Sequence, residues 1–214
     1  MIYVNYGCGL CAPENWSNYD GSPRLWLEST PVFSQIIGLW QGRLFPANVR
    51  YGDIVRGLPL EPSSADAVYA SHVLEHLSRH DVECALTNTY KLLRSGGIFR
   101  LVVPDIEWRA VRYLRDRAEG TCPAADAFIE SCNIGVKHMP KGLLGRLRAT
   151  YGHTGHRWMY DFHSMSTLLI QAGFVDVRRC TMGDSGDAMF DVVEAKDRFF
   201  EMGEHELALQ ARKP

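Results

Sequence analysis

The amino-terminal stretch carries the residue types and spacing most suggestive of chemistry: a glycine turn followed closely by an acid. A short apolar strand starting at Ile2 leads into Gly7-x-Gly9-x-x-Ala12, and a second short strand closes on Asp20. Glycines at such a turn let the backbone approach a ligand closely, and an acid after the next strand can accept hydrogen bonds from ribose hydroxyls. The pattern therefore indicates a nucleoside site.

The connection between these two strands is too short for a dinucleotide. Only seven residues separate Ala12 from Asp20, and they begin with Pro13. A dinucleotide site needs a helix at this point, because the amide groups at its N-terminus hold the pyrophosphate. Seven residues cannot form both a useful helix and a strand. We therefore predict an adenosine ligand without phosphates, of which S-adenosylmethionine (SAM) is the obvious one.

A second cluster of reactive side chains is His72-x-x-Glu75-His76, which follows a predicted strand. It matches the inverted zinc-protease motif His-x-x-Glu-His. On a helix, residues four apart share a face and could hold a metal while Glu75 acts as a base. Because the motif lies directly after a strand and close to the predicted ligand, we assign no metal ligands here. A zinc hydrolase is kept as the competing enzyme class, and a hydrogen-bonded helix residue as the plain alternative for His76.

The cysteines give little support to redox or structural metal chemistry. Cys8-x-x-Cys11 has the spacing of such sites, but zinc needs two further ligands and the chain has no second pair of this kind. We therefore expect these two thiols to pack within the glycine turn. The six cysteines are spaced irregularly over 214 residues. This argues against a disulfide framework and favours a reducing cytoplasm.

A third group of functional side chains lies late in the chain. Within it we expect a substrate pocket for an acceptor molecule, formed by His153, Trp158, Tyr160 and Asp161 and served by His156. An imidazole, an indole, a phenol and a carboxylate supply a base, an apolar wall and polar anchors. The alternative is that Trp158 and Tyr160 only fasten one part of the chain to the sheet.

The residues before this group form a basic stretch without any acid. Residues 137–157 contain Lys137, Lys141, Arg146, Arg148 and Arg157. The whole chain has a net charge of −2, and aromatic residues do not alternate with these basic ones, so a nucleic-acid partner is disfavoured. An anionic small-molecule partner or a solvated face fits better.

Alternating strands and helices must position these side chains, which favours a parallel sheet flanked by helices. The periodicity predicts helices over residues 31–42 and 164–172, and one that opens at Ser78 and ends at Gly96-Gly97. Strands are expected at both ends of the glycine turn and at 49–51, 65–70, 98–103, 175–180 and 206–211. Residues 106–160 lack a convincing strand, so we expect a helical cap inserted into one domain that spans residues 1–214.

Composition fits an ordinary globular enzyme. The apolar fraction is 46% and the charged fraction 22%. No apolar run approaches the roughly 18 residues of a membrane span, and the N-terminus shows no secretory signal. We therefore expect neither a membrane partner nor export.

Several motifs in a fixed order resemble class I SAM-dependent methyltransferases, and more narrowly their small bacterial branch. The motifs are Asn5-x-Gly7-Cys8-Gly9, Gly52-Asp53-Ile54-x-x-Gly57-Leu58-Pro59, Ala65 to Leu77, Leu92-Leu93-Arg94-Ser95-Gly96-Gly97-Ile98, Val103-Pro104-Asp105 and Gly155-His156-Arg157-Trp158-Met159-Tyr160-Asp161. The resemblance implies a Rossmann-like sheet of seven strands, mostly parallel, with a final antiparallel strand inserted beside its neighbours. It also implies SAM as cofactor, bound by Asn5, Gly7, Cys8, Gly9, Asp20, Asp53, Ile54, Ser71 and His72. Asn5 departs from the family, which usually has an acid there, and Ala12 replaces a third glycine.

The resemblance implies methyl transfer, in which alignment of the reacting atoms provides most of the catalysis. A hydroxyl or protonated amine acceptor also needs a base, and histidine is the usual choice near pH 7. The candidates for this catalytic role are His76, His72 and His156. No Asn-Pro-Pro-Tyr signature is present, so we expect a small-molecule, sugar or lipid-precursor acceptor with an oxygen or nitrogen nucleophile. A protein that binds SAM or S-adenosylhomocysteine without catalysis is the alternative.

Overall fold

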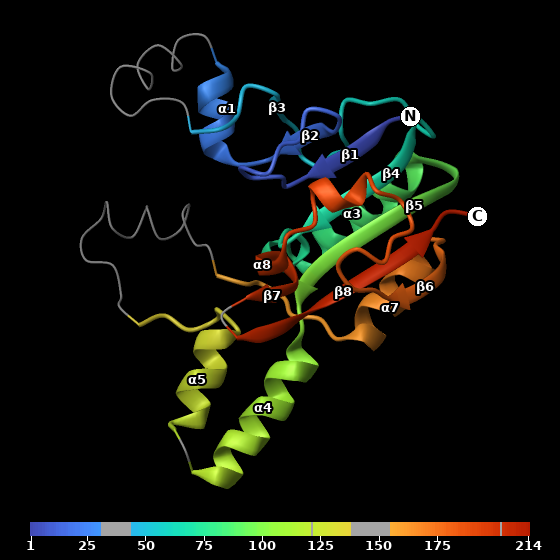
Figure 1. The fold of residues 1–214 in the computed structure, drawn as a ribbon. Coiled ribbons are helices and arrows are strands. Elements are labelled where there is room, and N and C mark those ends of the chain that lie inside the picture. Colours follow the sequence, from blue (N-terminus) through green and yellow to red (C-terminus); the bar gives the residue numbers. More distant parts are fainter. Residues whose placement is uncertain (31–43, 121, 138–154, 202) are drawn as a thin grey trace.

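A mostly parallel, twisted β-sheet runs through the centre of the protein (Figure 1). The computed structural model describes residues 1–30, 44–120, 122–137, 155–201 and 203–214. Seven strands lie in the order β3-β2-β1-β4-β5-β8-β6, and the two-residue strand β7 pairs with the start of β8. The strands are β1 Tyr3–Tyr6, β2 Ser17–Asp20, β3 Val49–Tyr51, β4 Ala65–Ser71, β5 Leu93–Pro104, β6 Val175–Arg179, β7 Phe200–Glu201 and β8 Glu204–Arg212.

The order and direction of the strands confirm the predicted fold class. Strands β3, β2, β1, β4 and β5 pair in parallel, whereas β8 lies antiparallel between β5 and β6. This is the seven-stranded Rossmann-like sheet with one inserted antiparallel strand. Because β1, β2, β3 and β4 are parallel neighbours, the residues that follow them meet at one edge of the sheet.

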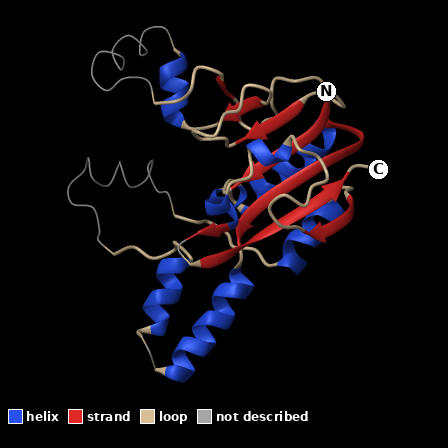
Figure 2. Cartoon of the chain, in the orientation of Figure 1, coloured by secondary structure: helices blue, strands red, loops and turns tan. Residues whose placement is uncertain are grey.

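Helices flank the sheet and extend beyond one end of it (Figure 2). They are α1 Pro23–Ser29, α3 Arg79–Leu92, α4 Ile106–Glu119, α5 Ala124–Ser131, α7 Phe162–Gln171 and α8 Lys196–Phe199, with short 3-10 helices η1 Leu74–His76 and η2 Phe190–Val192. The pair α4 and α5 starts at the carboxyl end of β5 and projects away from the sheet (Figure 1). Within the predicted helical cap, residues 106–119 and 124–131 are helical, whereas residues 132–137 and 155–160 have no helix.

Buried residues separate into two main layers, one on each face of the sheet. On the first face, α3 and α7 pack with Val82, Leu86 and Leu169 against alternate residues of the strands. The second face carries no long helix among the described residues. It is covered instead by Trp16 from the β1–β2 connection and by Phe190 of η2. Their rings meet edge to face, with centroids 5.6 Å apart.

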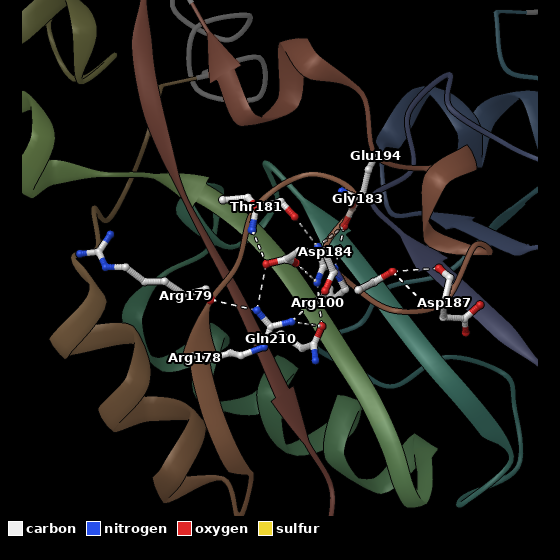
Figure 3. Close-up of polar contacts among 10 residues, drawn as sticks. Arg100, Arg178, Arg179, Thr181, Gly183, Asp184, Asp187, Glu194 and Gln210 are labelled. Atoms are coloured by element: carbon white, nitrogen blue, oxygen red, sulfur yellow. Dashed lines mark hydrogen bonds and ion pairs between the residues drawn. The ribbon is translucent and has the colours of Figure 1, made fainter.

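A buried arginine anchors the loop that covers this second face (Figure 3). The Arg100 guanidinium on β5 is 1% exposed. It donates hydrogen bonds to the Glu194 carboxylate at 2.7 Å, to Asp184 at 2.9 Å and to the Thr181 carbonyl at 3.0 Å. Three points of a loop are thus held to one strand, so an irregular segment can serve as a layer of the core.

Two elements differ from the sequence prediction, and a third prediction is not tested. The helix opened by Ser78 ends at Leu92, and β5 begins at once with Leu93, so the Gly96-Gly97 pair lies inside the strand. Helix α1 was not predicted: Ser22 caps it by accepting from the Leu25 amide, and Pro23 starts it. The helix predicted over 31–42 lies outside the described residues.

Candidate active site

A cavity of about 650 Å³ lies where the carboxyl ends of β1, β2, β3 and β4 meet. This volume is typical of a site for a small molecule or cofactor. Five of the predicted cofactor residues line the cavity, namely Gly7, Asp20, Asp53, Ile54 and His72, and the predicted base His76 lies beside them. Gly7 and His72, which are 65 positions apart in the sequence, thus line the same cavity.

The glycine turn after β1 is shaped by close packing. Gly7 has φ +63°, and a Cβ atom there would lie 2.1 Å from Cγ2 of Val73. Gly9 also has a positive φ, and its amide donates to Oδ2 of Asp20 at 3.0 Å. No helix follows the turn, because residues 7–16 form only turns and bends before β2. The predicted absence of a phosphate-binding helix is therefore confirmed.

The two predicted acids point their acceptor atoms toward the cavity from neighbouring strand ends. Asp20 is the last residue of β2 and also accepts from the Ser22 amide at 2.8 Å. Asp53 follows β3, accepts from the Val55 amide at 2.9 Å and has Arg56 at 3.5 Å. Each carboxylate is oriented by backbone amides and keeps further lone pairs for a ligand.

Three other predicted cofactor residues lie around a smaller hollow next to Gly7. They are Asn5, Cys8 and Ser71, and residues Cys11, Tyr69, Val193 and Arg198 complete the lining. The side-chain amide of Asn5 donates from Nδ2 to the Cys11 carbonyl at 2.9 Å and so closes the turn. An ionised acid at this position could not donate such a hydrogen bond. Burial raises the pKa of the Cys8 thiol to about 12, which keeps it protonated. The burial of Cys8 and the Asn5 contact are consistent with packing of this segment within the glycine turn.

His72 is held on both sides of its ring. Its backbone has φ +56°, a left-handed conformation uncommon for a residue with a side chain. Nε2 lies 3.0 Å from the Arg198 carbonyl and Nδ1 lies 3.4 Å from Oε1 of Glu75. Burial opposes the charge on this imidazole, but Glu75 outweighs it and the pKa of His72 is raised. These contacts suit a positioning role better than that of a proton acceptor.

Glu75, His76 and His156 form a cluster beside the cavity. Glu75 is fully buried, and its Oε1 lies 3.8 Å from Nε2 of His76. The rings of His76 and His156 meet edge to face with centroids 5.2 Å apart. Burial lowers the pKa of His156, against the opposing effect of Glu75, so this imidazole is neutral near pH 7.

The zinc-protease arrangement considered for His72-x-x-Glu75-His76 is not formed. That arrangement needs His72 and His76 on one face of an α-helix. Here His72 precedes the helix in a left-handed conformation, and residues Leu74–His76 form a single 3-10 turn. The helical premise was wrong, because the chain turns sharply where it leaves β4.

The predicted acceptor residues do not line the cavity. Tyr160 is fully buried in the core, and its backbone pairs with Asp105. Asp161 caps α7 by accepting from the Ser164 amide at 2.7 Å. Trp158 is 48% exposed, and its amide donates to the Glu75 carbonyl. This placement favours the alternative of a structural clasp for this segment; His153 lies outside the described residues.

Two residues at the site were missed as functional groups by the sequence analysis. Glu75 was considered only as the base of a hydrolase, yet its carboxylate links three histidines. Arg198 approaches from 126 positions away and holds the His72 ring through its carbonyl. No sequence motif marks a backbone carbonyl, so only the fold could reveal this contact.

Comparison with known proteins agrees with this picture. The family model described as "Methyltransferase domain" matches residues 35–101. No curated protein matches the sequence. Among solved structures, the S-adenosylmethionine-dependent methyltransferase SibL has a TM-score of 0.51 and 15% identity, over 100% of this chain and 50% of that one.

Two further structures are similar. A SAM-dependent methyltransferase from Thermotoga maritima has a TM-score of 0.49 and 14% identity, over 100% of this chain and 82% of its own. Phosphoethanolamine N-methyltransferase 2 of Haemonchus contortus, with bound S-adenosyl-L-methionine, has a TM-score of 0.46 and 12% identity, over 100% of this chain and 49% of its own. The chain thus spans about half the length of two of these three proteins.

The family match confirms the predicted resemblance to class I SAM-dependent methyltransferases for the central segment, and the likeness to SibL confirms the fold. Among the described residues, no helix has both the length and the apolar character that a membrane span needs.

Proposed function

We propose that this chain is a SAM-dependent methyltransferase acting on a small-molecule, sugar or lipid-precursor acceptor with an oxygen or nitrogen nucleophile. One observation carries the proposal: the glycine turn, Asp20 and Asp53 share a cavity of about 650 Å³ that has no phosphate-binding helix. The family match over residues 35–101 supports the same reaction class.

The residues present fit SAM by their chemistry. Asp20 accepts the ribose hydroxyls, and Asp53 with the backbone of Ile54 receives the adenine amino group. The apolar side chains of Ile54, Val73 and Leu77 form walls of the same cavity. Gly7 passes under the methionine part, and its missing Cβ lets the Val73 side chain pack closely against the turn. Asn5, Cys8, Gly9 and Ser71 complete the turn around that part.

When bound, SAM supplies a methyl group on a positively charged sulfur, and transfer leaves S-adenosylhomocysteine. The protein's task is to align the acceptor with that methyl group and to take its proton. His76 lines the cavity and is 40% exposed, so it can reach an acceptor there. Neutral His156, whose ring touches that of His76, provides a second proton acceptor.

We also propose the helical cap, residues 106–160, as the acceptor side of a single domain, and the reducing cytoplasm as its compartment. The six cysteines are free, as such a compartment requires. Arg109 of α4 joins the cap to β8 through two hydrogen bonds to Glu206, at 2.8 and 3.1 Å. The last described part of the cap reaches the edge of the cavity, because Arg157 and Trp158 donate their amides to the carbonyl of Glu75, next to His76.

The test is calorimetry of the purified protein with SAM, S-adenosylhomocysteine and NAD. We expect the first two to bind and NAD to bind more weakly. Asp20→Ala should lower SAM affinity roughly ten- to a hundredfold, by loss of two hydrogen bonds to a charged acceptor. Glu61→Ala, an exposed carboxylate outside the cavity, is the control. Tighter binding of NAD than of SAM would refute the proposal.

An acceptor screen with labelled SAM then separates the enzyme from a protein that only binds. Transfer of label to any small acceptor supports catalysis. Binding of SAM without transfer to sugars, lipid precursors, alcohols or amines would favour the binding protein instead.

A further inference from the structure

Two segments far apart in the sequence are fastened together beside the cavity. Residues 157 and 158 donate their amides to the Glu75 carbonyl, from Arg157 at 2.7 Å and from Trp158 at 3.2 Å. The amide of His156 donates to the Asn133 carbonyl at 3.0 Å. Backbone bonds therefore fix His156 next to Glu75 and His76, so the meeting of these side chains does not depend on flexible contacts.

The side chains that meet there lack the partners that buried polar groups normally have. Glu75 is 0% exposed, and its Oε1 has only ion-pair contacts, with the ring nitrogens of His72 at 3.4 Å and His76 at 3.8 Å. Its Oε2 has no hydrogen-bond partner among the described residues. Nδ1 of His156 is likewise buried without a partner. Burying such atoms unpaired costs free energy, and native structures seldom leave them so unless a ligand completes the site.

One ligand atom from each of Glu75, His76 and His156 lies within 4.8 Å of the other two. Two imidazoles and a carboxylate are a usual donor set for zinc and related divalent transition metals. Bonds of about 2.0–2.2 Å to such a metal place ligand atoms roughly 3.3–3.5 Å apart. Small side-chain rotations close the difference, and Oε1 of Glu75 is already 3.8 Å from Nε2 of His76.

An outer group of contacts supports the carboxylate. Nδ1 of His72 lies 3.4 Å from Oε1 of Glu75, and the other ring nitrogen lies 3.0 Å from the Arg198 carbonyl. Outer contacts of this kind orient the ligands of metal sites. His76 also lines the cavity, so a metal bound there keeps an open position toward it.

We propose that Glu75, His76 and His156 bind one divalent transition metal of the zinc class. The set differs from the zinc-protease motif, because Glu75 is a ligand rather than a base and the third ligand comes from the segment before α7. The sequence analysis assigned no metal ligands to His72-x-x-Glu75-His76, because this motif directly follows a strand close to the predicted ligand. No sequence motif links residue 156 to residues 75 and 76. The inference does not depend on the proposed methyl transfer. It would replace the proton-acceptor role proposed for His76 and His156, because a neutral imidazole has one acceptor nitrogen and the metal would occupy it.

The experiment uses untagged full-length protein, freed of metal with a chelator and dialysed. Zinc, cobalt, nickel and manganese are titrated by calorimetry, and cobalt also by its visible absorption, which reports the ligand geometry. We expect one zinc or cobalt ion per chain and a rise in melting temperature on binding. His156→Ala and His76→Ala should each lower the affinity at least roughly a hundredfold.

His163→Ala, an exposed histidine on α7, is the matched control and should bind metal like the wild type. Glu75→Gln keeps the side-chain volume and removes the charge of this ligand, and circular dichroism and thermal melting show whether the variant folds. If Glu75→Gln does not fold, His76→Ala still tests the site, because the His76 side chain is 40% exposed and its loss should not prevent folding.

Two results would overturn the metal site. One is wild-type protein that binds none of the four metals at one per chain. The other is stoichiometric binding that survives both histidine substitutions in folded protein. SAM binding is measured on the same samples, so failure of the proposed function and failure of the metal site are distinguished.

Discussion

Gly7 and Gly9 share a left-handed backbone but differ in their surroundings, which makes them a matched pair. Alanine at either position pays the conformational cost of a positive φ, roughly 1–2 kcal/mol. A Cβ at Gly9 meets nothing within 4 Å, whereas one at Gly7 overlaps Cγ2 of Val73. We expect Gly7→Ala to lower the free energy of unfolding by at least about 1 kcal/mol more than Gly9→Ala.

The same pair probes the cofactor site. Relief of the overlap shifts Val73, which lines the cavity, so Gly7→Ala should also weaken SAM binding more than Gly9→Ala does. Urea unfolding and calorimetry give the two quantities. Equal losses for both variants would show that only backbone strain matters at this turn.

Tyr160 carries a hydroxyl that is buried without a hydrogen-bond partner among the described residues, and burial raises its pKa to about 12. Removing an unpaired buried hydroxyl relieves a desolvation cost. We expect Tyr160→Phe to leave the free energy of unfolding unchanged or to raise it by up to about 1 kcal/mol. Thermal and urea unfolding measure this.

Tyr3→Phe is the control, because the Tyr3 hydroxyl donates to Asp187 at 2.8 Å and its loss should cost about 1 kcal/mol. The methyl-transfer activity of the Tyr160→Phe variant distinguishes an acceptor pocket from a structural clasp as the role of the segment that contains Tyr160. A fall of tenfold or more with normal stability would place the hydroxyl in the acceptor pocket. Unchanged transfer supports the clasp.

Sequence could predict that Gly7, Asp20 and Asp53 line one cavity, because they lie at the ends of strands that are also neighbours in space. Asp20 ends β2 and Asp53 follows the end of β3 by two residues, and a parallel sheet brings such ends together. The cluster of Glu75 with His156 could not be predicted, because backbone bonds between distant segments bring these residues together. Tyr160 and Asp161 have side chains suited to a pocket, but Tyr160 is buried in the core and Asp161 caps α7.

At the scale of elements, periodicity located the long helices and most of the strands, and local chemistry decided the boundaries. Hydrophobic residues of α3 recur at helical spacing, so its buried face was predictable. The start of β5 was not, because Leu93 changes to extended backbone while the apolar pattern continues. Helix α1 has only seven residues, too few for periodicity to reveal.

Ion pairs hold the loop that covers the second face of the sheet, so the stability of the protein should depend on pH. Asp184 is partly buried, but hydrogen bonds from Arg178 and Arg100 outweigh that burial and lower the pKa of its carboxyl from 3.8 to about 2. A carboxyl with a lowered pKa stabilises the fold above its unfolded value, and this contribution is lost as the pH falls through the folded value.

We therefore expect Asp184→Asn to destabilise the protein fully above about pH 4 and by progressively less as the pH falls toward 2. Urea unfolding of both proteins across this range gives the difference. Asp191→Asn, an exposed carboxylate in the same loop, is the control and should cost little at any pH. A difference between Asp184→Asn and the wild type that does not change with pH would show that the hydrogen bonds, and not the charge, matter.

At the scale of the whole molecule, the missing helix after β1 and the loop on the second face are parts of one arrangement. Without that helix, Trp16 can lie directly on the sheet next to Tyr3, with ring centroids 5.2 Å apart. The loop from Thr181 to Glu194 then covers Trp16 through Phe190. Its continuation carries Arg198 to the His72 ring, so the cover of the second face also lines the smaller hollow next to Gly7.

This arrangement predicts that one core residue couples stability to cofactor binding. Phe190 is fully buried, and Phe190→Ala should lower the free energy of unfolding by about 3–5 kcal/mol. Because Val193 and Arg198 follow it along the wall beside Gly7, SAM affinity should also fall roughly tenfold, or about 1.4 kcal/mol.

Phe174→Ala is the matched control, since Phe174 is an equally large side chain, 2% exposed, in the core of the opposite face. Phe174→Ala should lower the free energy of unfolding about as much as Phe190→Ala does. SAM affinity per folded molecule should stay normal, because Phe174 lines neither the cavity nor the smaller hollow next to Gly7. Calorimetry at a temperature where both variants are folded makes the comparison. Equal affinities would show that the loop covers the sheet without shaping the site, and Arg198 would then hold His72 independently of Phe190.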